Sequence, residues 1–83
     1  MKFIANINIM PREELLDPQG KATAHGLKNL GFDKVSNVRI GKRIQLEIDA
    51  TNEGDAQKKL NEACEKLLAN LIMEKFEVEL KKI

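Results

Sequence analysis

Two residue types that commonly carry catalysis occur once each in this chain, as His25 and Cys64. A histidine can act as an acid, a base or a metal ligand near neutral pH, and a cysteine thiolate can act as a nucleophile. No Cys, Asp or Glu stands at ligand spacing from His25 on the same helical turn, so we expect an exposed helix histidine. Cys64 falls on the apolar stripe of an expected helix, where burial shields a thiol from substrate. A free-standing enzyme that uses either residue is therefore the weakest hypothesis.

A cluster of cations surrounds one short turn of the chain. Arg39, Lys42 and Arg43 flank Gly41 and could together hold a phosphate or a carboxylate. A single glycine does not build the phosphate-cradling loop of a nucleotide-binding protein. We therefore favour a solvated or interface turn over an anion site.

The remaining polar candidates stand at the ends of expected elements. Asp17 and Asn70 are interpreted as helix caps, and Glu74 precedes the last expected strand. No Ser-His-Asp set, pair of catalytic carboxylates or dinucleotide-binding fingerprint can be assembled from the other residues. The sequence thus predicts no catalytic residues and no metal ligands, and it favours a chain that joins protein partners.

The size of the chain makes partners necessary. With 83 residues and no linker-like stretch, residues 1–83 are expected to form a single domain. A chain this short buries only about 60–65% of the surface that its unfolded form exposes, and oligomerisation is an obvious remedy for a thin core. A second copy or another protein is therefore expected.

Composition argues against several classes of function. The 14 Lys and Arg residues nearly balance the 13 Asp and Glu residues, and only Phe3, Phe32 and Phe76 are aromatic, so we expect no nucleic-acid partner. The first ten residues lack the continuous apolar run of a signal peptide, and no stretch approaches the roughly 20 apolar residues of a membrane span. One cysteine allows no internal disulfide. We expect a cytoplasmic location and no membrane partner.

The first strand and the first helix have clear signals. Alternation of apolar and polar residues predicts a strand over residues 2–10, which Pro11 ends because proline lacks a backbone donor. A helix is predicted over residues 18–30. Asp17 can cap its start, Pro18 suits its first position, and Gly31 suits the left-handed residue that follows many helices.

Two further strands are expected around the cationic turn. Residues 35–40 and 43–49 carry apolar side chains at strand-like spacing, and Gly41-Lys42 would join them as a hairpin. A two-residue turn would place the apolar side chains of the two strands on opposite faces, whereas a three-residue connection or a bulge would align them. The register over residues 40–44 therefore stays open.

The second half of the chain predicts a helix and a final strand. The helix begins near Glu53 and ends near Asn70, and the strand covers residues 75–81. The apolar positions of this helix are Ala56, Leu60, Ala63, Cys64, Leu67 and Leu68. The resulting β-α-β-β-α-β order predicts a ferredoxin-like α+β fold, a four-stranded antiparallel sheet with both helices on one face.

That architecture leaves one face of the sheet uncovered. Ile4 and Met10 would point toward this face, and Val38 and Ile40 would join them in one of the two registers. An apolar open face predicts that two copies dimerise through their sheets.

Short motifs follow one another at regular spacing along nearly the whole chain. The first half carries Pro11-Arg12, Leu16-Asp17-Pro18-Gln19-Gly20, Leu30-Gly31-Phe32 and Val38-Arg39-Ile40-Gly41-Lys42. The second half carries Cys64-Glu65-Lys66-Leu67-Leu68-Ala69-Asn70, and then Glu74. This ordered set resembles the PurS family, the small subunits of phosphoribosylformylglycinamidine synthase. Leu71 stands where that family usually has proline, which affects only the local turn into the last strand.

The resemblance implies a subunit of a purine-synthesis ligase that converts formylglycinamide ribonucleotide (FGAR), ATP and glutamine into the formylglycinamidine (FGAM). A large synthetase subunit would hold the ATP, Mg²⁺ and substrate, and a glutaminase subunit would supply ammonia. The small subunit would have no complete active site and would bind no cofactor alone. It would bridge the other two as a homodimer, with a dimer of dimers and the route of the ammonia left open.

The resemblance also assigns positions of partner contact or scaffold. They are Arg12, Asp17, Gln19, Arg39, Gly41, Lys42, Asn70 and Glu74. Arg39 and Lys42 are the candidates to bind partner carboxylates, because cations on a rigid hairpin lose little freedom on docking. The alternative function is a regulatory ferredoxin-like dimer that binds a small molecule between its sheets or at the hairpin.

Overall fold

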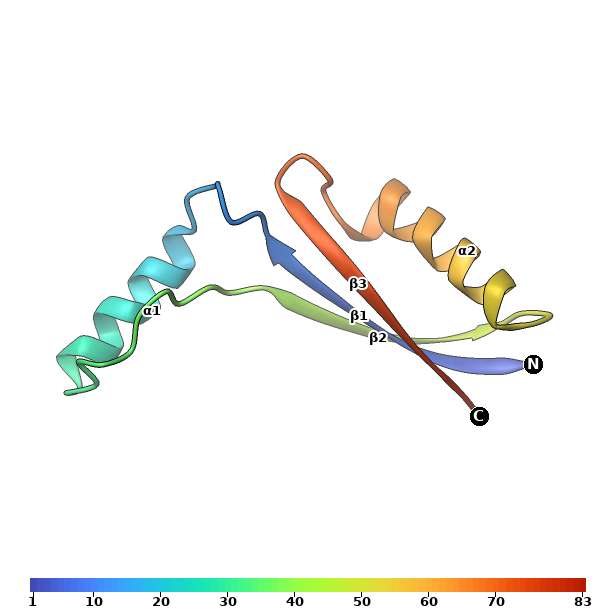
Figure 1. The fold of residues 1–83 in the computed structure, drawn as a ribbon, viewed down its shortest axis with the longest axis horizontal. Helices are drawn as coiled ribbons and strands as arrows, with labels where there is room; N and C mark the ends of the chain where they lie inside the picture. Colours follow the sequence, from blue (N-terminus) through green and yellow to red (C-terminus); the bar gives the residue numbers. More distant parts are fainter.

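The chain builds a twisted sheet that carries one helix and extends a second helix beyond its end (Figure 1). The computed structural model describes residues 1–83. The elements in order are β1 (Lys2–Pro11), α1 (Pro18–Asn29), β2 (Lys42–Asp49), α2 (Glu53–Ala63), η1 (Cys64–Leu68) and β3 (Glu74–Lys82). The predicted α+β class is confirmed, and every predicted element is present except the strand over residues 35–40.

β1 is the central strand of a three-stranded antiparallel sheet with the order β2-β1-β3. Ile7 of β1 pairs with Ile44 of β2 on one side and with Val78 of β3 on the other. Because side chains alternate along a strand, these residues place their apolar side chains on one common face. This apolar face is where the core forms.

The core lies between this face and α2. Leu60 and Cys64 of the helical segment pack with Ile7 and Ile9 of β1, and all four are fully buried. Complete burial of a Leu or Ile side chain contributes about 1.5–3 kcal/mol. The predicted burial of Cys64 is confirmed. Only 10 of the 83 residues are buried, so the core hardly extends beyond this contact.

The end of this helix, η1, is wound more widely than an α-helix. The N–H of Ala69 donates to the carbonyl of Cys64, five residues earlier, at 3.0 Å, which is the hydrogen bond of a π-helix. The extra residue turns Leu67 outward with 83% of its surface exposed, while Leu68 stays against the core. The predicted place of Leu67 on the buried stripe is therefore wrong.

The arm, which we define as residues 18–37, consists of α1 and the segment that returns beside it. Asp17 caps α1 and Pro18 is its first residue, as predicted. In Figure 1 this helix extends past the end of the sheet and does not lie across its face. The prediction of both helices on one face of the sheet is therefore wrong for this chain.

The returning segment contains no strand, so the sheet has three strands where we predicted four. Asn37 has a φ of 56°, a left-handed conformation that a strand cannot contain. The N–H of Ile40 donates to the carboxylate of Asp17 at 2.9 Å and not to another strand. Gly41-Lys42 is thus no hairpin turn, and Lys42 pairs instead with Ile9 of β1.

The face of the sheet opposite α2 is polar. Lys2–Glu47 and Asn6–Gln45 connect β1 with its neighbour β2 there, and Arg43–Glu79 joins the outer strands β2 and β3 across β1. Ile4 and Met10 are half-buried among such groups. Val38 and Ile40 lie outside the sheet. The apolar part of this face is therefore limited to Ile4 and Met10, without Val38 and Ile40, and dimerisation through the sheet stays a prediction.

The molecule is elongated. Its radius of gyration is 16.2 Å and its extents are 50 × 27 × 14 Å, whereas a compact chain of this length has a radius of gyration of about 12 Å. The arm accounts for the difference, because it reaches away from the sheet and its core (Figure 1). No helix has the length and apolar character needed to cross a membrane.

Candidate functional site: the junction of sheet and arm

The arm meets the sheet at a junction, which we define as residues 11–17, 38–41 and 70–74. Six of the eight predicted contact or scaffold residues lie in it, namely Arg12, Asp17, Arg39, Gly41, Asn70 and Glu74. Gln19 lies just outside it in the first turn of α1, and Lys42 begins β2. Hydrogen bonds between the three segments bring together residues that are far apart in the sequence, as where the N–H of Arg12 donates to the carbonyl of Met73 at 2.9 Å.

Asp17 ties the start of α1 to the returning segment. Its Oδ1 accepts the N–H of Gly20 at 3.0 Å, and its Oδ2 accepts the N–H of Ile40 at 2.9 Å. Nε of Arg39 lies 4.0 Å from Oδ2. The hydrogen bond from Gly20, followed by that from Ile40, holds the pKa of this carboxyl below its ordinary value of 3.8. The carboxylate is thus both a helix cap and a clamp between two segments.

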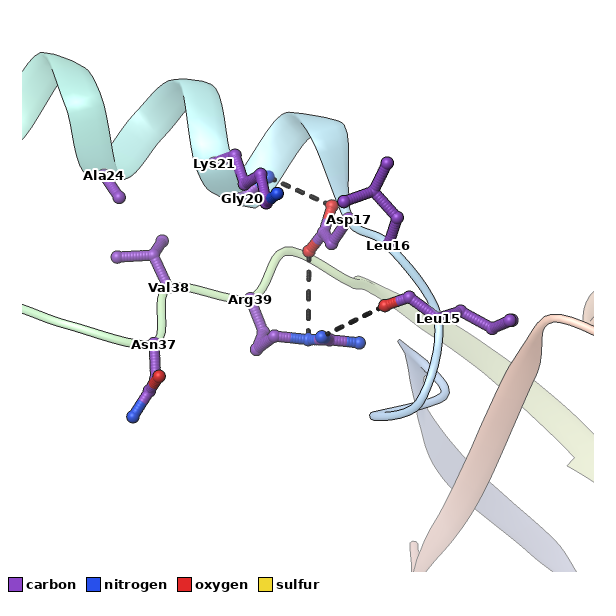
Figure 2. Close-up of a pocket in the computed structure, with 9 residues that line it drawn as sticks. All are labelled: Leu15, Leu16, Asp17, Gly20, Lys21, Ala24, Asn37, Val38 and Arg39. Atoms are coloured by element: carbon purple, nitrogen blue, oxygen red, sulfur yellow. Dashed lines mark hydrogen bonds and ion pairs between the residues drawn. The ribbon is translucent and has the colours of Figure 1, made fainter.

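Arg39 holds the loop that follows β1. Its guanidinium donates to the carbonyls of Pro11 at 3.2 Å, Arg12 at 2.7 Å and Leu15 at 3.4 Å. Figure 2 shows the side chain reaching from the returning segment toward Asp17 and Leu15. These contacts give Arg39 a scaffold role within the chain. Its predicted contact with a partner carboxylate stays a prediction.

Gly41 lies against β1, one residue before β2 begins. A Cβ atom at this position would overlap the carbonyl oxygen of Ile9 and Sδ of Met10. The absence of a side chain therefore allows the returning segment to enter the sheet. Gly41 was predicted to form a hairpin turn, whereas in the structure a glycine is needed here because the chain lies close to β1.

The other three predicted residues of the junction organise the turn between η1 and β3. Nε and Nη2 of Arg12 donate to the carbonyl of Leu71 at 3.0 and 2.7 Å. The N–H of Asn70 donates to Oε1 of Glu74 at 2.8 Å, and Oδ1 of Asn70 accepts the N–H of Ile72 at 3.1 Å. Arg12, Asn70 and Glu74 thus fix the backbone of this turn.

Two predicted residues have side chains without a polar partner in the chain. Gln19 and Lys42 are exposed, and their side chains form no hydrogen bond or ion pair. His25 is exposed on α1. At Cys64, burial and then the negative charge of Glu65 raise the pKa of the thiol, which opposes formation of a nucleophilic thiolate.

A cavity of about 310 Å³ lies between α1 and the returning segment (Figure 2). Leu15, Ala24 and Val38 give it apolar walls, and Asp17 and Arg39 border it. Asp17 and Arg39 already bind groups of the chain itself, whereas Lys21, which also lines the cavity, forms no ion pair, so the lining combines apolar walls with one unpaired cation.

Sequence reasoning missed the apolar residues of the junction. Leu15 and Leu16, and Leu71 with Ile72 and Met73, lie outside any strand or helix. Adjacent large apolar residues between elements were the available signal, because a solvated loop is normally polar. No group of three or more His, Cys, Asp and Glu residues is placed to hold a metal ion.

Comparisons with known proteins agree on one family. Residues 4–82 match the family model described as PurS: Phosphoribosylformylglycinamidine (FGAM) synthase. A Synechocystis protein named phosphoribosylformylglycinamidine synthase subunit PurS is 43% identical over 74 residues, 89% of this chain and 74% of that protein. A Bacillus subtilis protein of the same name is 39% identical over 81 residues, 98% of this chain and 95% of that protein.

A solved structure shares the architecture. A chain in the structure of PurLQS from Thermotoga maritima superposes with a TM-score of 0.90 at 32% identity, and the match covers 98% of this chain and 99% of that chain. Because nearly the whole of both chains is included, the sheet and the arm have a similar arrangement in the two.

Proposed function

Since the chain belongs to the PurS family of FGAM synthase subunits, we propose that it is a homodimer that bridges the synthetase and glutaminase subunits of this ligase and supports the transfer of ammonia. The observation that carries this proposal is the arm. It is held rigidly at the junction, yet it reaches away from the only core of the chain. A rigid extension of this kind is suited to binding other chains.

The arm and the sheet each offer an incomplete apolar surface for a second copy. Three large apolar residues of the arm are exposed, namely Leu30 by 75%, Phe32 by 55% and Val35 by 46%. The inward side chains of β2, Ile44, Leu46 and Ile48, are only half-buried. In the proposed homodimer, the arm of one copy covers β2 of the other, so that two chains together complete the helical layer that a ferredoxin-like fold would have.

The chemistry of the reaction is assigned to the other subunits. The synthetase subunit would use ATP and Mg²⁺, and the glutaminase subunit would release ammonia from glutamine. The raised pKa of the Cys64 thiol and the exposure of His25 away from the junction support a subunit that contributes no catalytic group. The T. maritima PurLQS structure supports an assembly of this kind. A cytoplasmic location fits such a complex and a single free cysteine.

Within the proposed assembly the predicted residues divide into two groups. The six junction residues act mainly as scaffold. Gly41 allows close packing against β1, and the side chains of the other five bind neighbouring segments. Gln19 and Lys42 have free polar groups and are the better candidates for contact with another subunit. Lys42 would bind a partner carboxylate, because its ammonium group has no ion pair within the chain.

The test is reconstitution from purified subunits. We expect the chain to elute as a dimer in size-exclusion chromatography with light scattering, and to enter a larger species with the synthetase and glutaminase subunits in the presence of ATP and glutamine. Glutamine-dependent formation of FGAM should require the chain. A dimer that joins neither subunit and restores no activity would contradict the proposal and favour a ligand-binding regulatory dimer.

A further inference from the structure

One edge of the sheet is open along the whole of β2. Because the sheet has the order β2-β1-β3, β2 has a neighbouring strand only on the side of β1. Its pairing with β1 continues without a bulge from Lys42 to Asp49, and residues 43–49 make no backbone hydrogen bond to a turn or loop. Backbone groups of an edge strand that point away from the sheet can pair with a further strand. β2 is therefore a regular and accessible edge.

The polar side chains of β2, which face away from α2, change sign about the middle of the strand. Arg43 lies at one end of this row, and Glu47 and Asp49 lie toward the other end. Opposite charges placed directly across two antiparallel strands attract each other. A second copy of β2, antiparallel and centred on Leu46, would place its Asp49 opposite Arg43 and its Arg43 opposite Asp49. Gln45 would lie opposite Glu47 in the same way, so the strand is complementary to itself in charge.

The apolar side chains of β2 match in the same arrangement. Leu46 would lie opposite Leu46 of the second copy, and Ile44 would lie opposite Ile48. All three are only half-buried in the single chain, so pairing would remove further apolar surface from water. A two-fold axis perpendicular to the sheet keeps the apolar faces of both copies on one side, whereas an axis along the strands would turn them to opposite sides. The antiparallel arrangement therefore joins the two apolar faces into one surface.

Shifted pairings of β2 fit less well. A shift by one residue would place apolar side chains opposite polar ones. A shift by two residues in one direction would place Lys42 opposite Ile48, and in the other direction it would place Glu47 opposite Glu47 of the second copy. The pairing centred on Leu46 is therefore the favoured register.

The other edge of the sheet lacks this complementarity. β3, paired with itself in the same way around Val78, would place Lys75 opposite Lys81 and Glu77 opposite Glu79. Like charges directly opposite each other destabilise a pair of strands. A second copy is therefore expected on the β2 edge and not on the β3 edge.

We propose that β2 pairs antiparallel with β2 of a second copy around a two-fold axis at Leu46, so that the two sheets form one continuous sheet. The inference rests on the proposed function and adds to its homodimer the strand, the register and the charged residues that select the partner. This register brings Asp49 of the second copy to the start of β2, which is the end of the sheet from which the arm leaves (Figure 1). Strand pairing and the contact made by the arm therefore belong to one interface.

Engineered disulfides test the register. Leu46→Cys places one thiol of each copy on the two-fold axis, where paired Cα atoms lie about 4.5–5.5 Å apart, within the range of a disulfide. Ile48→Cys places the two Cα atoms about 13 Å apart along the strands, which excludes a disulfide. Both variants keep Cys64, which is fully buried. After mild oxidation we expect a linked dimer on a non-reducing gel for Leu46→Cys, and none for Ile48→Cys or the unaltered chain.

An exchange of charges tests the complementarity and replaces the first experiment if a cysteine variant does not fold. We expect Arg43→Asp and Asp49→Arg each to raise the dissociation constant of the homodimer about tenfold, because like charges then face each other twice. The two replacements in one chain restore opposite charges and should return this constant to within about threefold of the unaltered chain. Lys81→Asp on β3 is the matched control and should change it by less than about twofold. Light scattering over a range of concentrations measures each constant.

The outcomes separate this inference from the proposed function. A homodimer in which Leu46→Cys forms no disulfide, or in which Ile48→Cys forms one as readily, overturns the strand pairing alone. A double charge variant as weak as the single ones overturns it too. An unaltered chain that stays monomeric overturns the homodimer of the proposed function itself.

Discussion

The carboxylate of Asp17 joins two segments that the sequence separates by 23 residues. One oxygen accepts the N–H of Gly20 within α1, and the other accepts the N–H of Ile40 as the chain returns to the sheet. A carboxylate has acceptors on both oxygens, whereas an asparagine amide has one acceptor and one donor group. Replacing Asp17 with Asn therefore costs one of the two bonds and removes the charge that strengthens the other.

The stability that Asp17 contributes should depend on pH. Its pKa is lowered in the folded chain, so the folded state binds the proton less readily than the unfolded state. The contribution is therefore fully present above the ordinary value of 3.8 and is lost as the pH falls through the lowered pKa. We expect Asp17→Asn to lower the Tm clearly at neutral pH, and we expect this difference to shrink as the pH falls below 3.8 and through the lowered pKa. Thermal unfolding followed by circular dichroism across this range measures it.

Asp33→Asn is the matched control for this experiment. Asp33 is exposed in the returning segment and forms no hydrogen bond or ion pair. Its replacement should leave the Tm nearly unchanged at both pH values. A Tm difference for Asp17→Asn that stays constant down to strongly acidic pH would show that the lowered pKa does not stabilise the fold.

At the scale of elements, Arg39 decides how the arm is oriented. One guanidinium binds the carbonyl of Pro11 at the end of β1 and two carbonyls of the loop that leads to α1, although Arg39 itself precedes β2. The loop and the returning segment therefore move as one unit. The prediction differed, since it placed Arg39 on a hairpin with its guanidinium free to bind a partner.

Removing this guanidinium should loosen the junction. We expect Arg39→Met to lower the free energy of unfolding by about 1.5 kcal/mol, the low end for hydrogen bonds to a charged group, because the side chain is partly exposed. Hydrogen exchange should increase most at the amides of Leu15 and Ile40. Urea unfolding and exchange mass spectrometry measure the two effects.

Arg43→Met provides the comparison with the same change on the sheet. Arg43 makes an exposed ion pair with Glu79, and such pairs contribute little. Its replacement should alter the free energy of unfolding by less than about 0.5 kcal/mol. Equal effects of the two variants would argue against a special role of Arg39 at the junction.

Most elements could be predicted from the sequence because their signals are local. The alternation in β1, the Asp17-Pro18 start of α1 and the apolar spacing in α2 each act within a few residues. The strand over residues 35–40 failed because Asn37 adopts a left-handed conformation and the N–H of Ile40 is bound by a carboxylate distant in sequence. Neither cause is visible in a pattern of apolar residues.

The junction could be predicted only in part. Its charged residues were named by family resemblance, but their acceptors are largely backbone carbonyls, as for Arg39 and Arg12. Every residue has a carbonyl, so such a contact leaves no signature in the sequence. Leu71, Ile72 and Met73 stand out in the sequence as adjacent apolar residues between elements, but the hydrogen bonds with Arg12 and Asn70 that fix them as an exposed turn leave no signature there.

At the scale of the whole molecule, the elongated shape separates the arm from the sheet and its core. The arm leads away from the core at one end of the sheet, and α2 covers the apolar face of the sheet (Figure 1). With 10 of 83 residues buried, this chain has far less core than an independent domain usually needs. Its stability should therefore depend on association, and its Tm should rise with protein concentration.

The arm provides the direct test of this dependence. We expect Phe32→Asp to shift the proposed homodimer toward monomer by at least about tenfold in dissociation constant, because a charge would enter the proposed apolar contact. Size-exclusion chromatography with light scattering over a range of concentrations measures the shift. Leu67→Asp is the control, since Leu67 is exposed on η1, away from the arm. A stable Phe32→Asp dimer would exclude the arm from the contact between copies.

The π-helical turn at η1 also determines where the chain can change its length. Ala69 binds Cys64 across five residues, so deletion of one residue between them, such as Lys66, would convert this bond into the ordinary bond of an α-helix. Elsewhere in the helix a deletion would rotate every following side chain away from the core. Evolution can therefore insert or delete a residue at this one position, and each such event changes how far the following turn projects from the sheet.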